Sequence, residues 1–208
     1  METKFGNVSV KVGEKALFIQ RHGNPCLPPH RLNHRANIAA VKESGAAKIV
    51  AINSVGSLKE SLHPGTLVIP DDFVSPWRIE TFYDDQMCFT IPALDAIFAR
   101  ELFDVCRMHT GSVELGGTYV QTIGPRLETK AEIRIFKQFG DIVGMTLASE
   151  ATLAIEYGLP YASICSLDNY AHGILPVPLT MEEISLNVLK NIKTIENIVN
   201  TLITKGLA

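Results

Sequence analysis

The segment that runs from Gly140 to Glu150 restricts the fold of this chain more than any other part of its sequence. Its apolar residues end at Gly144, and Met145 and Thr146 follow before a helical pattern begins with an acidic residue in its first turns. This order predicts a buried strand, then a short loop, then the N-terminus of a helix. In an open α/β sheet such strand ends collect ligands, because free backbone N–H groups and the helix dipole both favour anions there.

Strand patterns and helix patterns alternate along the rest of the chain. We expect an opening hairpin, because residues 8–12 and 15–20 both read as strands on either side of a tight turn. Residues 73–91 are irregular and rich in aromatic side chains, which indicates a functional or interface loop. Further strands are expected at 48–52, 65–70, 116–123 and 161–167, and helices at 32–44, 93–108, 129–139, 149–157 and 180–204. The alternation predicts one domain spanning 1–208, built on a mixed α/β sheet with helices on both sides.

Charge and composition narrow the classes of partner. The formal net charge is −3 at pH 7, so no basic surplus exists to neutralise the phosphates of nucleic acids or anionic membranes. No apolar run approaches the roughly 18–20 residues that span a bilayer, and the first residues do not resemble a signal peptide. The cysteines are far apart, which favours free thiols in a reducing cytoplasm, and the histidines lack metal-ligand spacing. We therefore expect a cytoplasmic protein without a nucleic-acid, membrane or metal partner.

Three expected strand ends carry groups that could bind an anion. The tripeptide Arg21-His22-Gly23 combines a guanidinium fork and an imidazole with a glycine that permits close approach, although a surface Arg and His near a turn would look the same. Residues 53–57 would offer successive N–H groups to an anion or a ribose, or would form a simple turn. Thr146 offers a hydroxyl at the third strand end.

Glu128 and Asn169 indicate a site that could read a base. Taken singly, a Glu just before a helix could complement the helix dipole, and an Asn at a strand end could form an Asx turn. Together, a carboxylate that accepts and an amide that both accepts and donates could read the edge of an oxopurine. Met145 would more often be a core residue than a ligand contact. No nucleophile-elbow, P-loop or dinucleotide-binding motif occurs.

Six motifs occur in order, at compatible spacing, over nearly the whole chain. They are Arg21-His22-Gly23; Asn33-His34-Arg35-Ala36-Asn37-Ile38; Gly56-Ser57-Leu58 with Pro64-Gly65; Gly124-Pro125-Arg126-Leu127-Glu128-Thr129 with Ala131-Glu132; Gly144-Met145-Thr146 with Glu150; and Asn169-Tyr170. Together they resemble the trimeric purine nucleoside phosphorylase and methylthioadenosine phosphorylase family. The resemblance implies a mixed, partly barrel-like central β-sheet surrounded by helices. It also implies a homotrimer that converts purine nucleosides reversibly to free base and (deoxy)ribose 1-phosphate, with inorganic phosphate as co-substrate and no cofactor.

The resemblance places a phosphate site and a ribose site at matching positions. Arg21, His22, Ser54 and Thr146 would hold phosphate. Met145 would lie against the ribose and leave room for an oxocarbenium-like transition state. Phosphate and sugar cation would then form an ion pair that the protein mainly positions.

The resemblance also implies how the base is held. Asn169 would hydrogen-bond N7 of the purine and stabilise negative charge on the leaving base, while Glu128 would accept from N1–H of a 6-oxopurine. Leu127 and Val143 would sandwich the ring. An aromatic or His residue of a neighbouring subunit would cover the ribose, and the loop 73–89 is the expected source.

Two positions refine the expected substrate. Family members that use 6-aminopurines carry Asp at the position of Asn169 and lack the Glu that matches Glu128, so the resemblance implies a 6-oxopurine. Phosphorylases of ordinary nucleosides have His at the position of Met181, where it hydrogen-bonds the 5′-hydroxyl. A thioether cannot donate and would instead pack against an apolar 5′ group. We therefore expect phosphorolysis of 6-oxopurine nucleosides, with S-methyl-5′-thioinosine as the preferred or a competing substrate.

One departure from the family pattern concerns the first residues. Family members begin with a strand and a Gly-Gly-Thr/Ser-Gly loop that contacts phosphate, and this chain starts after the matching segment. The resemblance therefore implies a sheet that lacks the family's first strand and leaves its neighbour unpaired. Two alternative functions follow: a nucleosidase-like hydrolase that releases base without phosphate, and an inactive purine-binding homologue.

Overall fold

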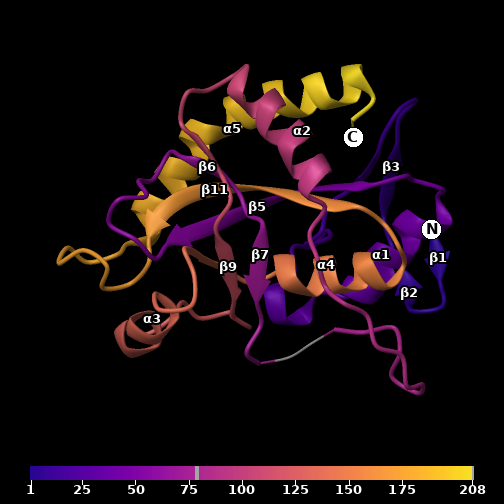
Figure 1. Cartoon of the computed structure of the whole chain (residues 1–208), viewed down its shortest axis with the longest axis horizontal. Helices are drawn as coiled ribbons and strands as arrows, with labels where there is room; N and C mark the ends of the chain where they lie inside the picture. Colours follow the sequence, from indigo (N-terminus) through magenta and orange to yellow (C-terminus); the bar gives the residue numbers. More distant parts are fainter. Residues whose placement is uncertain (78–79, 208) are drawn as a thin grey trace.

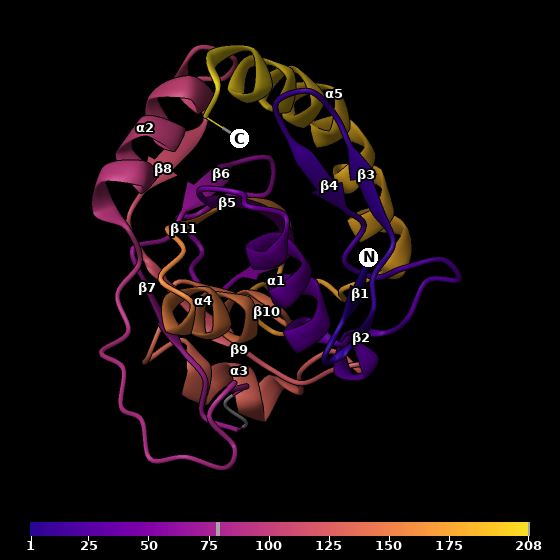
Figure 2. The same cartoon turned by 90° about the vertical axis from the view of Figure 1, so that its right-hand side faces the viewer.

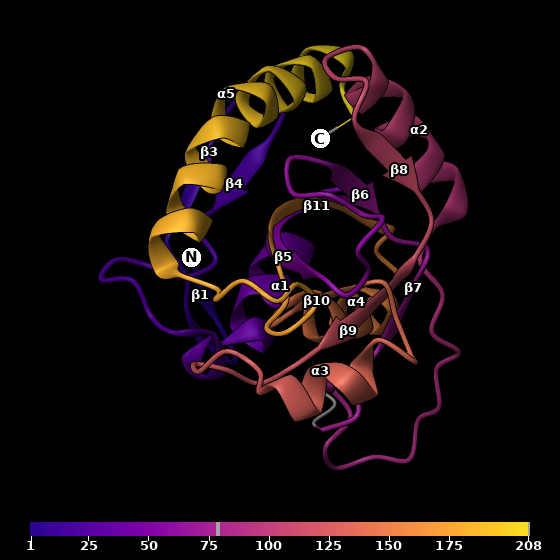
Figure 3. The same ribbon diagram turned by 90° about the vertical axis from the view of Figure 1, so that its left-hand side faces the viewer.

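The computed structural model describes residues 1–77 and 80–207. Seven strands form its central sheet: β5 (Ile49–Ser57), β6 (Leu67–Ile69), β7 (Asp72–Val74), β8 (Val113–Leu115), β9 (Thr118–Gln121), β10 (Ile142–Gly144) and β11 (Tyr161–Tyr170). Their order in the sheet is β7–β9–β10–β5–β11–β6–β8, with parallel and antiparallel neighbours. The sheet curls into part of a barrel (Figure 2 and Figure 3). The expected mixed, partly barrel-like sheet is confirmed.

In the described part of the chain, five α-helices surround this sheet. They are α1 (His34–Glu43), α2 (Ala96–Arg107), α3 (Lys130–Phe136), α4 (Leu147–Glu156) and α5 (Met181–Lys205). Helices α1 and α4 lie on one side of the long strands β5 and β11, and α2 and α5 lie on the other (Figure 1). Outside the sheet are the short pairs β1 (Glu2–Thr3) with β2 (Gly6–Asn7) and β3 (Val10–Val12) with β4 (Leu17–Ile19), and a 3-10 turn, η1 (Pro29–Arg31). The β3–β4 pair is the expected opening hairpin.

Strands β5 and β11 are longer than the sequence pattern predicts. They pair in parallel from Ile49 opposite Tyr161 to Ser57 opposite Tyr170, with one irregularity between Leu167 and Asn169. The prediction that residues 53–57 form a loop is therefore wrong, and so is the prediction that the last strand ends at Leu167. Each strand continues because the other supplies a hydrogen-bonding partner beyond the apolar run, which a local pattern does not reveal.

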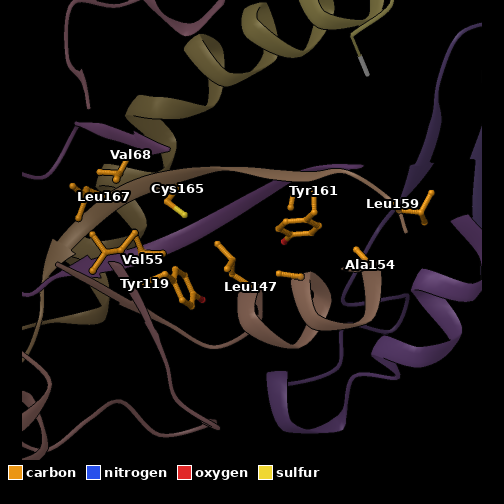
Figure 4. Packing of buried hydrophobic residues seen from close by; sticks show 12 residues of the cluster. Val55, Val68, Tyr119, Leu147, Ala154, Leu159, Tyr161, Cys165 and Leu167 are labelled. Carbon is orange, nitrogen blue, oxygen red and sulfur yellow. The ribbon is translucent and has the colours of Figure 1, made fainter. Parts of the chain in front are cut away.

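Both faces of β11 are buried. On one face Tyr161 and Cys165 pack with Leu147 and Ala154 of α4 (Figure 4). On the other face Ile164 packs in a cluster that includes residues of α2 and α5. A strand covered on both sides does not alternate between buried and exposed positions, and residues 161–169 of β11 are all buried.

The segment 140–150 forms the strand, loop and helix that the sequence predicts. Strand β10 ends at Gly144, where an added Cβ atom would collide with the hydroxyl of Tyr119. The same hydroxyl accepts a 3.2 Å hydrogen bond from the backbone N–H of Thr146. Helix α4 begins at Leu147, two residues before the predicted start, and Thr146 occupies its N-cap position without a side-chain capping hydrogen bond.

The other elements agree with the sequence pattern in part. The predicted capping box is present: Thr129 accepts from the N–H of Glu132, whose carboxylate accepts from the N–H of Thr129. The strand patterns missed β8 and the β1–β2 pair, which have two or three residues each. The predicted loop 73–91 overlaps β7, which pairs with β9, and its positions 78 and 79 lie outside the described residues.

Candidate active site

A single pocket brings together the residues that the sequence singles out. Its volume is about 260 Å³. Its walls include all ten predicted site residues: Arg21, His22, Ser54, Leu127, Glu128, Val143, Met145, Thr146, Asn169 and Met181. These residues come from segments that the fold brings to one end of the curled sheet, among them β5, β10, β11 and the N-terminus of α5. Their individual roles stay predictions.

Arg21 follows β4 and is already paired within the protein. Its Nε and Nη2 atoms donate to the two carboxylate oxygens of Glu150 on α4, the second at 2.9 Å, and its Nη1 donates to the carbonyl of Ile52 at 3.0 Å. Burial alone would lower the pKa of Arg21, but the adjacent carboxylate raises that pKa above its usual value. Arg21 therefore enters the pocket wall as a fixed cation, and not as the free surface residue considered above.

Thr146 also has an internal partner. Its hydroxyl donates to Oδ1 of Asn53 at 2.7 Å, and the Asn53 amide donates to Ser163 at 2.7 Å. Thr146 can donate to a phosphate oxygen only if its hydroxyl turns away from Asn53. Ser54, the next residue of β5, is exposed to the pocket.

His22 has a defined ring orientation. Its Nδ1 atom lies 2.8 Å from the carbonyl oxygen of Leu27. A carbonyl only accepts, so Nδ1 carries the proton and Nε2 is the atom left for a ligand. This contact comes from a loop residue that the sequence analysis did not associate with the site.

The base-reading pair lies on another part of the pocket wall. Glu128 is 8% exposed, and its Oε1 accepts from the hydroxyl of Thr122 at 2.5 Å. Asn169 donates one amide N–H to the carbonyl of Tyr170 at 2.9 Å. The strand irregularity before Asn169 redirects this side chain, a common use of β-bulges near sites. Gly56 makes room for it, since a Cβ there would lie 3.1 Å from the Asn169 amide nitrogen.

Apolar side chains complete the pocket. Val143 is buried, Leu127 is 41% exposed, and Met181 at the first position of α5 is 65% exposed. Leu179 and Ile184 line the wall beside Met181, so the helix N-terminus presents an apolar surface to the pocket. Such a surface suits an apolar substituent better than a hydroxyl.

Several residues of the pocket wall could not be recognised from the sequence. Leu179 and Ile184 looked like ordinary residues before and within a helix, and Pro29 belonged to an unassigned loop. His172, whose Nδ1 lies 3.2 Å from the backbone carbonyl of Glu128, gave a weak signal because it follows Asn169 by only three positions. Glu150 does not line the pocket, and the sequence marks it as an acid in the first turns of the helix that follows Thr146 without showing its contact to Arg21.

Within the described residues, 1–77 and 80–207, no helix is long and apolar enough to cross a membrane. Within the same residues, no three His, Cys, Asp or Glu side chains are grouped so that they could hold a metal ion.

The fold and the pocket agree with the comparison to known families. The family model described as the phosphorylase superfamily matches residues 2–204. The chain belongs to this superfamily.

Relatives in this superfamily are similar over most of the chain. A probable 6-oxopurine nucleoside phosphorylase of Archaeoglobus fulgidus is 39% identical over 211 residues, covering 99% of this chain and 87% of the relative. A probable S-methyl-5′-thioinosine phosphorylase of Methanocaldococcus jannaschii is 42% identical over 205 residues, covering 95% of this chain and 79% of the relative. Among solved structures, a double mutant of an adenosine/methylthioadenosine phosphorylase from Schistosoma mansoni in complex with adenine superposes with a TM-score of 0.87. It is 25% identical and covers 98% of this chain and 84% of its own.

Proposed function

We propose that the protein is a purine nucleoside phosphorylase of the pentosyltransferase class that cleaves 6-oxopurine nucleosides with inorganic phosphate. The observation that supports this proposal is that one pocket holds together the residues predicted to bind the anion, face the ribose and read the base. Relatives named as phosphorylases of 6-oxopurine nucleosides and of S-methyl-5′-thioinosine support it and do not favour a hydrolase or an inactive binder. Inorganic phosphate is the co-substrate, and the reaction needs no cofactor.

The reaction exchanges one bond at the anomeric carbon for another. The bond between C1′ and N9 breaks, its electron pair leaves with the purine, and a phosphate oxygen forms a new bond to C1′. Arg21, His22, Ser54 and Thr146 hold the phosphate, and Met145 lies against the ribose. These residues act by position and charge, because the phosphate dianion itself stabilises the sugar cation.

The base is recognised by two buried side chains, Glu128 and Asn169. Asn169 has one amide N–H bonded to Tyr170, so its second N–H is the one that donates to N7 as negative charge develops. Glu128 has Oε1 bonded to Thr122, so Oε2 accepts from N1–H of a 6-oxopurine. Leu127 and Val143 pack against the two faces of the ring.

The preferred or a competing substrate is S-methyl-5′-thioinosine. Met181, Leu179 and Ile184 form the apolar wall, and Met181 has no hydrogen atom to donate to a 5′-hydroxyl. A methylthio group would bury apolar surface on this wall, whereas a hydroxyl would leave water without gaining a partner from Met181.

The assembly is a cytoplasmic homotrimer in which a neighbouring subunit covers the ribose. The segment after residue 80 supports this arrangement, because Met87, Phe89 and Ile91 are 89%, 88% and 91% exposed. Large apolar side chains clustered on an exposed loop are typical of an interface. The exposed free thiols of Cys26 and Cys88 fit a reducing compartment.

The deciding experiment measures release of hypoxanthine from S-methyl-5′-thioinosine and from inosine with and without phosphate. We expect release only with phosphate, accompanied by the sugar 1-phosphate, and kcat/KM higher for the methylthio compound. Release in phosphate-free buffer would identify a hydrolase. Hypoxanthine binding in calorimetry without turnover of either nucleoside would identify an inactive binder.

A further inference from the structure

A buried carboxylate holds the arginine of the pocket wall. Glu150 and Arg21 are 129 positions apart in the sequence, yet the carboxylate takes two of the guanidinium nitrogens in a bidentate pair. The third nitrogen, Nη1, donates to the carbonyl of Ile52 in β5. Arg21 lines the pocket, whereas Glu150 does not. The carboxylate therefore touches the cation from the side away from the ligand.

Glu150 is itself fixed from two further elements. It is 5% exposed and accepts a 3.0 Å hydrogen bond from the hydroxyl of Tyr161 in β11. The ring of His34, at the start of α1, places Nδ1 3.8 Å from Oε1. Burial alone would raise the pKa of Glu150, but Arg21 and then His34 outweigh it and hold that pKa below its usual range. The carboxylate is thus charged and cannot easily rotate.

The donors that remain on Arg21 suit a phosphate. A guanidinium has five N–H groups, of which Glu150 takes two and Ile52 takes one. One N–H is left on Nη1 and one on Nη2, and this is the number that a bidentate contact to a phosphate requires. We propose that Glu150 is a positioning residue that aims these two N–H groups into the pocket, an inference that rests on the function proposed above.

The direction in which phosphate binding changes when Glu150 is replaced distinguishes a positioning role from a purely electrostatic one. A negative carboxylate near a phosphate site weakens anion binding by electrostatic repulsion, so loss of its charge alone would strengthen binding. If Glu150 acts by position, its loss weakens phosphate binding in spite of the removed charge. A variant that keeps the negative charge on a shorter side chain should also weaken phosphate binding.

Two variants test this distinction. Glu150→Asp keeps the charge but is one methylene shorter, and Glu150→Gln keeps the length but replaces one acceptor by an N–H donor that faces Arg21. In both we expect the KM for phosphate to rise about tenfold or more, as for the loss of one charged hydrogen bond, with the KM for nucleoside changed less than about twofold. The rise in Tm that inorganic phosphate gives the wild-type protein should shrink in both variants.

Control variants keep the test decisive. Glu101→Gln removes a carboxylate from an ion pair with Lys48 at 3.5 Å, outside the pocket, and should leave both KM values unchanged. If the Glu150 variants do not fold, Tyr161→Phe tests the positioning role instead. It removes one hydrogen bond to Glu150 and leaves the ion pair with Arg21 intact. We expect it to raise the KM for phosphate about threefold through a less rigid carboxylate.

Failure of the inference can be told from failure of the proposed function. A wild-type protein without phosphate-dependent activity would refute the phosphorylase function. An active wild-type protein whose Glu150 variants, or Tyr161→Phe, bind phosphate equally or more tightly would refute the positioning role. A fall in Tm without any change in the phosphate-induced increment would show that Glu150 serves stability alone.

Discussion

Replacement of Glu128 by Gln tests the proposed recognition of a 6-oxopurine base. Glu128 is 8% exposed, and its Oε1 is occupied by the Thr122 hydroxyl at 2.5 Å. The substitution keeps the shape of the side chain but removes its charge, and it can place an N–H donor opposite the N1–H of the base. One charged hydrogen bond is then lost between protein and substrate, and two donors face each other.

The size of the effect follows from that bond. A hydrogen bond to a charged group contributes about 1.5–3 kcal/mol, and about 1.4 kcal/mol corresponds to a tenfold change in rate. We expect kcat/KM for inosine to fall roughly 10- to 150-fold. The fall should be similar for S-methyl-5′-thioinosine, because the two substrates share the base. Initial rates of hypoxanthine release at saturating phosphate, with purified wild-type and variant protein, measure it.

Adenosine and a neighbouring variant provide the controls. Adenosine has no N1–H, so its kcat/KM should stay constant or increase in Glu128→Gln. Glu132→Gln removes a carboxylate four positions further on that pairs with Arg126 at 2.7 Å and does not line the pocket. An unchanged kcat/KM for inosine in Glu128→Gln, or an equal loss for adenosine, would refute the base-reading role of Glu128.

Two further predictions concern substrate choice and the pH dependence of stability. Met181→His supplies a donor beside the 5′ position and removes apolar surface, so the ratio of kcat/KM for S-methyl-5′-thioinosine to that for inosine should fall about tenfold; an unchanged ratio would contradict the role of Met181. For Glu132, the hydrogen bonds from Arg126 lower the pKa to about 2, from an ordinary value of 4.5. Its folded pKa lies below its unfolded pKa, so its contribution to stability is present above about pH 4.5 and is lost as the pH falls toward 2. The difference in Tm between wild type and Glu132→Gln should therefore shrink between those pH values, and a constant difference would exclude this linkage.

The sequence predicts the elements that have strong local signals. Helix α3 is located by its capping box of Thr129 and Glu132, and β10 ends where Gly144 was expected to end it. Strand lengths are predicted less well. Residues 53–57 contain small and polar side chains that indicate a turn, but pairing with β11 extends β5 through all of them. Local chemistry cannot show this pairing, because the partner strand lies more than a hundred positions later.

The candidate site, like the fold, could be predicted from the sequence only in part. The residues that line the pocket could be identified from the sequence, because phosphate, ribose and purine each demand particular donors or acceptors. The contacts that these residues make within the protein could not be predicted from the sequence. Arg21 meets Glu150, and Thr146 meets Asn53, only after distant elements have packed together. The tripeptide at Arg21 therefore looked like either an anion site or a surface turn, and the structure shows a partly buried cation paired with Glu150.

These internal contacts bear on how the pocket would work. Arg21, Thr146, Glu128 and Asn169 each have a hydrogen-bonding partner in the protein before any ligand binds. Such partners limit rotation, so less side-chain entropy is lost when a ligand binds. They also differ in what they leave available: Arg21 and Asn169 keep unused N–H groups, whereas the Thr146 hydroxyl has to leave Asn53 before it can donate. Phosphate binding should consequently depend more on Arg21, and on the carboxylate that orients it, than on Thr146.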